Sequence, residues 1–181
     1  MEQGNLEAPY LTFDNVFNPQ ELGMIKTILH NCDWQVSTTE DHGAAQVGQK
    51  KGMSCNLGLL YPDATFTFPT NPLVGIQQSI LNGDVGEGHW AWRYFNSKNV
   101  MSVIAAKYSE GDYYEPHFDH SMLTILCFFA DDYVLGGDLV LEKSHKINFK
   151  HNRVVIIPGV IIHEVTPVLA GNRYSITMFI A

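Results

Sequence analysis

The hydrophobic pattern changes near residue 100. From there on, short runs of β-branched and aromatic residues alternate with glycine, proline and asparagine turns, a pattern typical of strands. The predicted strands span residues 100–108, 121–130, 138–143, 146–149, 153–158, 160–168 and 173–181. Because no helical segment separates them, they indicate a mainly β fold with flanking helices, in the form of a sandwich, jelly roll or barrel.

The residues before 100 contain the signals of a helix. Asn18 is a favourable N-cap, Pro19 suits the first helical position, and the predicted helix continues to about His30. Residues 10–17 before this cap are predicted to form a short strand. A second helix is predicted over residues 71–81, where a proline stands near the start and Asn-Gly follows the end.

The polar, glycine-containing stretch over residues 37–56 has no sustained periodicity, which predicts a loop or a weak hairpin. Within it, residues 40–56 are open to two interpretations. Such loops serve as lids that order on substrate binding, and they also occur as plain disordered segments.

Composition and charge narrow the class of protein. The chain has 181 residues and a net charge of −8, so broad electrostatic contact with nucleic acid or anionic lipid is not expected. No apolar run approaches the roughly 18 residues of a membrane helix. The first residues lack the basic and apolar regions of a signal peptide. The three cysteines, Cys32, Cys55 and Cys127, are scattered and odd in number, which predicts reduced thiols and a cytoplasmic location.

A His-x-Asp triplet at His117 and Asp119 is the first candidate for chemistry. Side chains at i and i+2 of a strand point to the same face, so this imidazole and carboxylate would project together. A hydrogen-bonded surface pair is the alternative interpretation. His163 follows a very apolar segment, where an unpaired ring is costly to bury. It is either a structural histidine bonded to a backbone carbonyl or a metal ligand.

Two imidazoles and one carboxylate on neighbouring strands can supply three ligands on one side of a metal and leave positions open. This arrangement is typical of non-haem Fe(II) oxygenases. The same donor set also binds zinc, so a zinc hydrolase is the rival enzyme class. The sequence lacks the HExxH motif of zinc hydrolases, which disfavours that rival.

Arg173 and Ser175 share one face of the last predicted strand, whereas Tyr174 and Ile176 occupy the other. If the first face points inward, the buried guanidinium needs an anionic partner, and its planar fork matches a carboxylate. A surface salt bridge is the alternative for Arg173. Tyr108 ends the strand before the His-x-Asp triplet, where its hydroxyl would reach the same region; a core aromatic is the alternative.

Three segments together resemble the prolyl 4-hydroxylase-like branch of the Fe(II)/2-oxoglutarate-dependent dioxygenases, in the compact form found in bacteria and bacteriophages. They are YSEGDYYEPHFDH (108–120), GGDLVLE (136–142) and the stretch 152–180. The order tyrosine, HxD, GGxL, HEV and RxS is more specific than any one of these pieces.

The resemblance implies a double-stranded β-helix, the jelly roll of cupin-like proteins. It implies a single dioxygenase domain over residues 1–181, in which residues 1–99 supply helical and strand support and substrate loops. Residues 100–181 would form the jelly-roll core with the metal site.

The resemblance also implies specific roles at the site. Fe(II) would be bound by His117, Asp119 and His163, with no catalytic side chain beyond this metal centre. Arg173 would bind the distal carboxylate of 2-oxoglutarate, and Ser175 is a candidate helper.

Tyr108 matches a tyrosine that hydrogen-bonds the cosubstrate in relatives. Oxygen-sensing relatives carry a second cosubstrate tyrosine on the strand matching residues 122–129, where this chain has Cys127-Phe128-Phe129. Thr124 is the candidate to supply that hydrogen bond instead.

The implied activity is hydroxylation of a substrate, with release of succinate and CO2 and with ascorbate as a candidate reductant. A peptide or protein, such as a peptidyl proline, is the expected substrate, and a small molecule is the alternative; no nucleic acid or membrane partner is expected. The competing hypothesis from another class is a cupin-like module that binds a metal or carboxylate without catalysis.

Overall fold

The computed structural model describes residues 10–37, 50–57 and 100–180, together with the isolated positions 78, 82, 91 and 92. The predicted helix over residues 71–81 lies almost entirely outside the described residues, as do residues 40–49 of the candidate lid. No helix within the described ranges is long and apolar enough to cross a membrane.

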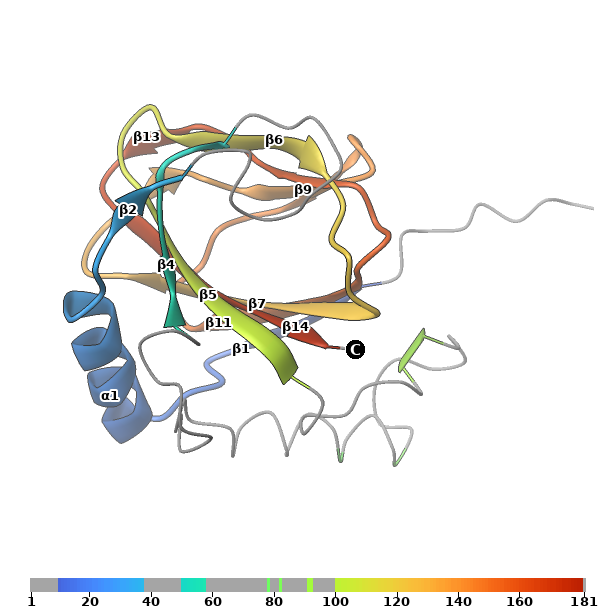
Figure 1. The fold of residues 1–181 in the computed structure, drawn as a ribbon, viewed down its shortest axis with the longest axis horizontal. Helices are drawn as coiled ribbons and strands as arrows, with labels where there is room; N and C mark the ends of the chain where they lie inside the picture. Colours follow the sequence, from blue (N-terminus) through green and yellow to red (C-terminus); the bar gives the residue numbers. More distant parts are fainter. Residues whose placement is uncertain are drawn as a thin grey trace, which may run out of the picture.

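Two antiparallel sheets face each other (Figure 1). The larger sheet has the strand order β1-β11-β7-β14-β5-β4-β2. Its strands are β1 (Leu11–Asp14), β2 (Gln35–Val36), β4 (Met53–Asn56), β5 (Val100–Tyr108), β7 (Leu123–Ala130), β11 (Arg153–Pro158) and β14 (Arg173–Ile180).

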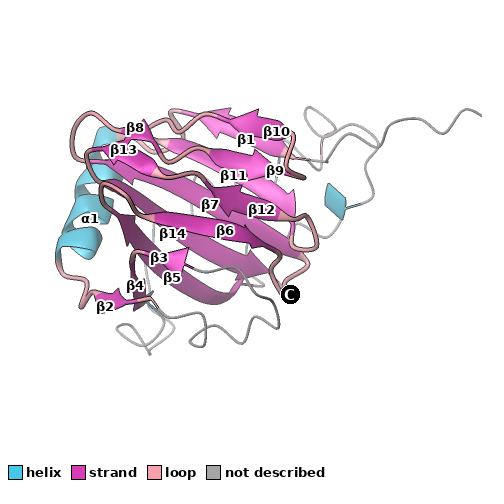
Figure 2. Ribbon diagram, turned by 90° about the horizontal axis from the view of Figure 1, so that it is seen from above, coloured by secondary structure: helices cyan, strands magenta, loops and turns pink. Residues whose placement is uncertain are grey.

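The smaller sheet has the order β10-β9-β12-β6-β3. Its strands are β3 (Lys50–Lys51), β6 (Tyr113–His117), β9 (Leu139–Leu141), β10 (His145–Ile147) and β12 (His163–Val165). A two-stranded sheet of β8 (Leu135–Gly136) and β13 (Val168–Ala170) lies at one end (Figure 2). This is the predicted jelly roll.

The larger sheet is buried on both faces. On β7, Leu126 and Phe128 point between the sheets and pack with Leu139 and Leu141 of β9. Alternate β7 residues, such as Phe129, join the apolar cluster on the opposite face instead. Burial on both sides explains why β7 is a continuous apolar run rather than an alternating one.

Helix α1 (Pro19–His30) covers the outer face of the larger sheet (Figure 1). The Asn18 side chain accepts hydrogen bonds from the backbone N–H groups of Gln20 and Glu21, and the Glu21 carboxylate accepts one from the Asn18 N–H. This capping box starts the helix at the predicted residue. Ile25 and Leu29, four residues apart, form its buried stripe.

Three local predictions differ from the structure. The stretch 37–56 is predicted as a loop or a weak hairpin, but its described end contains β3 and β4, which pair with β6 and β5 rather than with each other. Strand β6 was not predicted as an element of its own. The strand predicted over residues 160–168 is interrupted, since residues 160–162 form a turn before β12.

Asp14, at the end of β1, forms ion pairs with two basic side chains, Arg153 of β11 and Lys150 before it. Its carboxylate accepts hydrogen bonds from Arg153 Nε at 2.6 Å and Lys150 Nζ at 2.7 Å. These contacts hold the pKa of Asp14 far below its ordinary value. The carboxylate is one-third exposed, so water screens much of this interaction.

We expect Asp14→Asn to lower the free energy of unfolding by about 1 kcal/mol at pH 7. The folded-state pKa lies below the unfolded value near ~4, so this contribution is present above pH ~4 and is lost as pH falls. Denaturant unfolding from pH 7 to pH 2 measures it, with the exposed Asp132→Asn as control. A difference from wild type that persists undiminished at pH 2 would contradict this origin.

Candidate metal centre and cosubstrate cavity

Neighbouring strands of the smaller sheet place two histidines side by side. His117 ends β6 and His163 begins β12, and they are direct partners in the antiparallel register. Their ring centroids lie 4.2 Å apart. Asp119 was expected on the same strand as His117, but β6 ends at His117 and Asp119 lies in the loop that follows. Its backbone N–H donates to the Gly159 carbonyl at 2.8 Å, which holds the loop toward the histidines.

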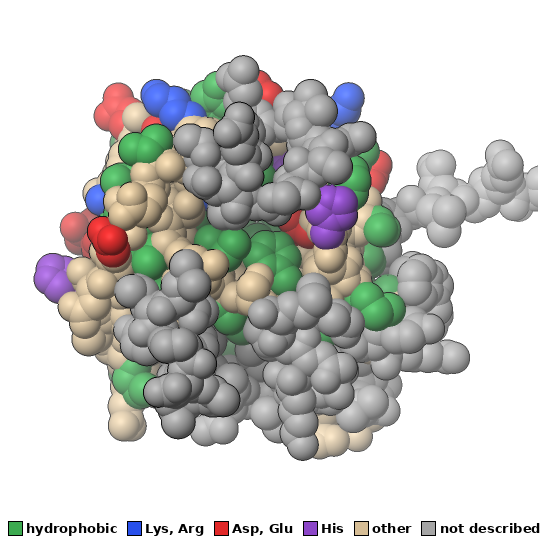
Figure 3. Space-filling view, in the orientation of Figure 1, with side chains coloured by type: hydrophobic (Ala, Val, Ile, Leu, Met, Phe, Trp, Pro, Cys, Tyr) green, Lys and Arg blue, Asp and Glu red, His purple; other side chains and the backbone are tan. Residues whose placement is uncertain are grey.

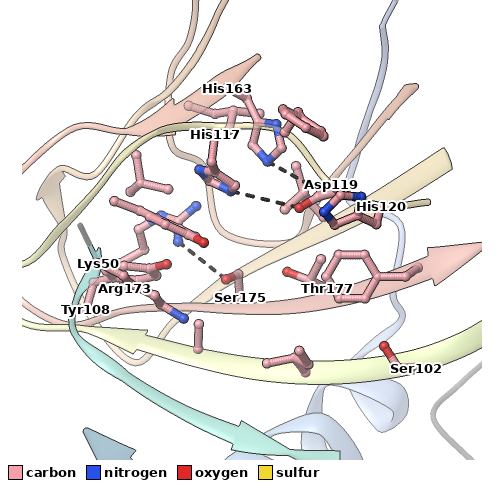
Figure 4. Close-up of a pocket in the computed structure, with 18 residues that line it drawn as sticks. Lys50, Ser102, Tyr108, His117, Asp119, His120, His163, Arg173, Ser175 and Thr177 are labelled. Carbon is pink, nitrogen blue, oxygen red and sulfur yellow. Dashed lines mark hydrogen bonds and ion pairs between the residues drawn. The ribbon is translucent and has the colours of Figure 1, made fainter. Parts of the chain in front are cut away.

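The structure brings His117, Asp119 and His163 into one cluster (Figure 4). Asp119 Oδ1 lies 3.9 Å from His117 Nε2, and Asp119 Oδ2 lies 3.5 Å from His163 Nε2. One ligand atom from each residue lies within 4.8 Å of the other two. Three oxygen and nitrogen donors at this separation can converge on one metal ion.

Backbone carbonyls set the orientation of both rings. His117 Nδ1 lies 2.8 Å from the Glu115 carbonyl, and His163 Nδ1 lies 2.9 Å from the Ile161 carbonyl. A carbonyl only accepts, so each Nδ1 carries the proton, and in the neutral rings each Nε2 presents a lone pair to the cluster. Tyr114 stacks on His117 at a centroid distance of 3.6 Å and further restricts that ring.

The Thr124 hydroxyl is committed to this cluster rather than to a cosubstrate. It donates to Asp119 Oδ2 at 2.6 Å and lies 2.9 Å from the Ser121 hydroxyl. Thr124 is fully buried and does not line the neighbouring cavity. The expectation that Thr124 replaces a cosubstrate tyrosine is therefore corrected: the loop after Asp119 folds back, and the threonine orients the carboxylate instead.

The second part of the site is the buried Arg173 on β14, whose side chain is 1% exposed. Its Nε donates to the Gly137 carbonyl at 2.9 Å, and Nη1 lies 3.4 Å from Ser175 Oγ. Nη2 is buried without a hydrogen-bond partner among the described residues. An unpaired guanidinium N–H in the interior is costly, so this atom marks the place of an acceptor that a ligand would bring.

Aromatic rings surround this guanidinium. Arg173 Cζ lies 4.7 Å from the Phe128 ring centroid, 5.1 Å from that of Tyr108 and 5.7 Å from that of Phe149. Tyr108 is the direct β5 partner of Arg173. Burial raises the pKa of Tyr108 far above its ordinary value, so the phenol stays protonated and can donate a hydrogen bond. Burial lowers the pKa of Arg173 to about 10, which leaves it charged at neutral pH.

One cavity of about 230 Å³ connects the two parts of the site. His117, Asp119 and His163 line one end, and Arg173 and Tyr108 line the other (Figure 4). In the space-filling view, a hollow with hydrophobic side chains at its floor opens on this side of the molecule, with acidic and histidine side chains beside it (Figure 3). The predicted alternation of β14 is correct, because Arg173 and Ser175 enter this cavity and Ile176 joins the opposite cluster.

Lys50 is a cavity residue that the sequence did not predict. It comes from β3, on the segment predicted as a loop, and its ammonium lies 5.6 Å from the Tyr108 ring centroid and 5.5 Å from that of Tyr114. Burial, together with the nearby Arg173 charge, lowers the pKa of Lys50 to about 8. The lysine belongs to no motif in the sequence, so only the pairing of β3 with β6 reveals it.

Residues 103–181 match the family model described as the 2OG-Fe(II) oxygenase superfamily. This match covers somewhat less than half of the chain. Members of the 2OG-Fe(II) oxygenases use Fe(II) and 2-oxoglutarate, and the matched region contains the His117–Asp119–His163 cluster and Arg173.

Two similar proteins are named as hydroxylases. The chain is 28% identical to a PKHD-type hydroxylase of Nitrosomonas europaea, over 94% of this chain and 77% of that protein. It is 32% identical to a PKHD-type hydroxylase of Synechococcus sp., over 42% of this chain and 40% of that protein. The match thus spans less than half the length of the Synechococcus relative.

A solved structure shares the fold. The viral collagen prolyl hydroxylase of Paramecium bursaria Chlorella virus-1, in its 2-oxoglutarate complex, superposes with a TM-score of 0.62. The superposition covers 95% of each chain at 14% sequence identity. At 14% identity, this similarity shows a shared fold and nothing about activity.

Proposed function

We propose that this protein is an Fe(II)- and 2-oxoglutarate-dependent hydroxylase. The reaction consumes 2-oxoglutarate and O2, converts a substrate C–H bond into C–OH, and releases succinate and CO2. One observation carries the proposal: a single cavity has a His-Asp-His donor cluster at one end and a buried arginine with an unpaired N–H at the other. These two features match a metal and a carboxylate respectively.

His117, Asp119 and His163 fit Fe(II) by their chemistry. Two imidazoles are held with Nδ1–H on carbonyls, so their Nε2 lone pairs face the carboxylate. Three protein donors leave coordination positions open for the cosubstrate and O2, and the bound metal supplies the redox chemistry. The protein holds the donors in place, and Thr124 fixes the carboxylate through its hydroxyl.

Arg173 and Tyr108 fit the far carboxylate of 2-oxoglutarate. The unpaired Nη2 and the protonated phenol are donors at the end of the cavity opposite the metal cluster. The Gly137 carbonyl fixes the guanidinium through Nε, and a side chain at Gly137 would clash with Arg173 Cδ at 2.7 Å. Ser175, 3.4 Å from Nη1, holds the same side chain from β14.

We expect Thr124→Val to weaken Mn(II) or Fe(II) binding by about tenfold while the protein stays folded. Valine keeps the volume of threonine but removes the hydroxyl that donates to Asp119. Anaerobic calorimetric titration with metal measures the effect, and Thr12→Val on the exposed side of β1 is the matched control. Equal metal affinities for Thr124→Val and wild type would contradict a positioning role.

For the substrate, we propose a peptide or protein, with a peptidyl proline as the first candidate and a small molecule as the alternative. Support comes from the collagen prolyl hydroxylase of the same fold and from the neutral side chains near the metal end, such as Phe118, Thr177 and Phe179. Ascorbate is proposed as the reductant.

We also propose a single dioxygenase domain over residues 1–181, since α1 and β1 to β4 pack or pair with the jelly-roll strands. A cytoplasmic location is proposed as well. It is supported by Cys32, Cys55 and Cys127, which are all free thiols.

Succinate release tests the reaction class. Protein loaded anaerobically with Fe(II) is given 2-oxoglutarate and O2, with and without a panel of proline-containing peptides. Succinate that requires both Fe(II) and O2 supports the oxygenase, and a mass gain of one oxygen atom in one peptide identifies the substrate class. Hydrolysis of a substrate by the zinc-loaded protein, without succinate, would instead support a zinc hydrolase. Absence of any turnover across metals and peptides would favour a binding module.

A further inference from the structure

Two neighbouring lysines of β3 have opposite surroundings. Lys51 points outward, where its ammonium lies 3.3 Å from the Gly111 carbonyl and 3.8 Å from Asp112. Lys50, its neighbour on the strand, points to the other face and lines the cavity between the sheets. The strand geometry therefore delivers one lysine, and not the other, to the site.

Among the described residues, the ammonium of Lys50 has only aromatic faces as partners. It lies over the rings of Tyr108 and Tyr114, 5.6 and 5.5 Å from their centroids. Within the described part of the chain, no carboxylate lies at ion-pair distance and no acceptor is within hydrogen-bond reach of it. Ring faces replace only part of the hydration that the ammonium loses in a partly buried position.

The acidic groups nearest to the cavity already have partners. Asp112 accepts from the Ser109 N–H at 2.9 Å, and Asp138 pairs with Lys146 at 2.6 Å. Asp119 lies at the opposite end with the two histidines. Among the described residues, none thus provides an anion for Lys50 in this part of the cavity.

Lys50 lies at the same end of the cavity as Arg173. Both side chains face the ring of Tyr108, with Arg173 Cζ 5.1 Å from its centroid, and Figure 4 shows them together, away from the metal cluster. Apart from histidines, the charged side chains that line the cavity within the described ranges are Lys50, Arg173 and Asp119. Two cations without an anion repel each other, and a ligand carboxylate at this end removes that repulsion.

We propose that Lys50 binds the distal carboxylate of 2-oxoglutarate together with Arg173, and that it makes the site select dicarboxylic over monocarboxylic 2-oxo acids. This inference rests on the proposed function. Arg173 contributes the directed N–H of its fork, and Lys50 contributes a point charge from the opposite sheet. Cosubstrate binding would thereby tie the edge strand β3 to β14.

The test separates the charge of Lys50 from its packing. Binding of 2-oxoglutarate and of 2-oxopentanoate, which has the same chain length but no distal carboxylate, is measured by calorimetry on the Mn(II)-loaded protein without O2. Lys50→Met keeps the apolar stem and removes the charge, Lys50→Arg keeps a charge, and Lys51→Met is the matched neighbour. Circular dichroism tests whether each variant is folded. If Lys50→Met does not fold, Lys50→Gln is used in its place.

We expect Lys50→Met to weaken 2-oxoglutarate binding by about tenfold or more and to leave 2-oxopentanoate binding unchanged. Lys50→Arg should retain most of the affinity, and Lys51→Met all of it. If Lys50→Met weakens the binding of both ligands equally, Lys50 acts by packing. If it changes the binding of neither ligand, Lys50 does not contact the carboxylate. Either result overturns the inference. If wild-type protein binds neither ligand, the proposed function itself fails.

Discussion

Replacing Asp119 with alanine should abolish iron-dependent turnover of 2-oxoglutarate and leave a folded protein. Asp119 is the one carboxylate in the cluster, and its two oxygens lie 3.9 and 3.5 Å from the Nε2 atoms of His117 and His163. Without it, two neutral imidazoles remain, and two donors without a negative charge hold a ferrous ion more weakly than the complete set of three. We expect the metal affinity to fall by more than about 100-fold. Loss of a residue that only hydrogen-bonds a metal ligand typically lowers the affinity by about 10- to 100-fold, and loss of the ligand itself should lower it further.

The fold should tolerate Asp119→Ala because the side chain lies in a loop, outside the apolar clusters. The Thr124 hydroxyl that loses its acceptor can still donate to the Ser121 hydroxyl. Metal titration, succinate release and thermal unfolding are measured together, with Asp132→Ala as an exposed aspartate control. Near-normal turnover in a folded Asp119→Ala protein would reject this aspartate as a metal ligand.

Replacing Arg173 with lysine should raise the dissociation constant of 2-oxoglutarate by about 10- to 100-fold. This is the effect of losing one charge-assisted hydrogen bond of roughly 1.5–3 kcal/mol. Lysine keeps a positive charge but lacks the fork. It cannot both donate to the Gly137 carbonyl, as Nε does, and present a second directed N–H to a ligand, as Nη2 does.

Arg153→Lys is the matched control for this prediction. Arg153 also uses its fork, but on Asp14, and it does not line the cavity, so its replacement should change stability and not cosubstrate affinity. Binding is measured on Mn(II)-loaded protein without O2. An unchanged dissociation constant in Arg173→Lys would count against the arginine as the carboxylate anchor.

Predictions from the sequence succeed where the cause is local. The start of α1 depends on Asn18, Pro19 and Glu21, which contact one another within one turn, so their order in the chain is sufficient. That Arg173 and Ser175 share one strand face follows from the two-residue period of a strand, and the structure shows that this face lines the cavity.

Predictions fail where the partner is remote. The short strand β3 has a polar sequence, and it forms because β6 offers backbone hydrogen bonds across the sheet edge. Thr124 lies on the strand face that could contact a cosubstrate. The loop that contains Asp119, however, brings the Asp119 carboxylate to the Thr124 hydroxyl, which donates a hydrogen bond to it. Lys50 lies more than a hundred residues before Arg173 in the chain, and no spacing rule connects them.

The amino-acid sequence by itself determined the β class and the first helix, because these depend on periodicity and on neighbours a few residues apart. The family resemblance and the order of candidate ligands came from short motifs in sequence order. Only the tertiary structure decided that His117 and His163 are direct partners, that Asp119 reaches them from a loop, and that the cavity holds a second cation. Sheet register and loop closure set these positions, and both depend on backbone pairing between distant segments.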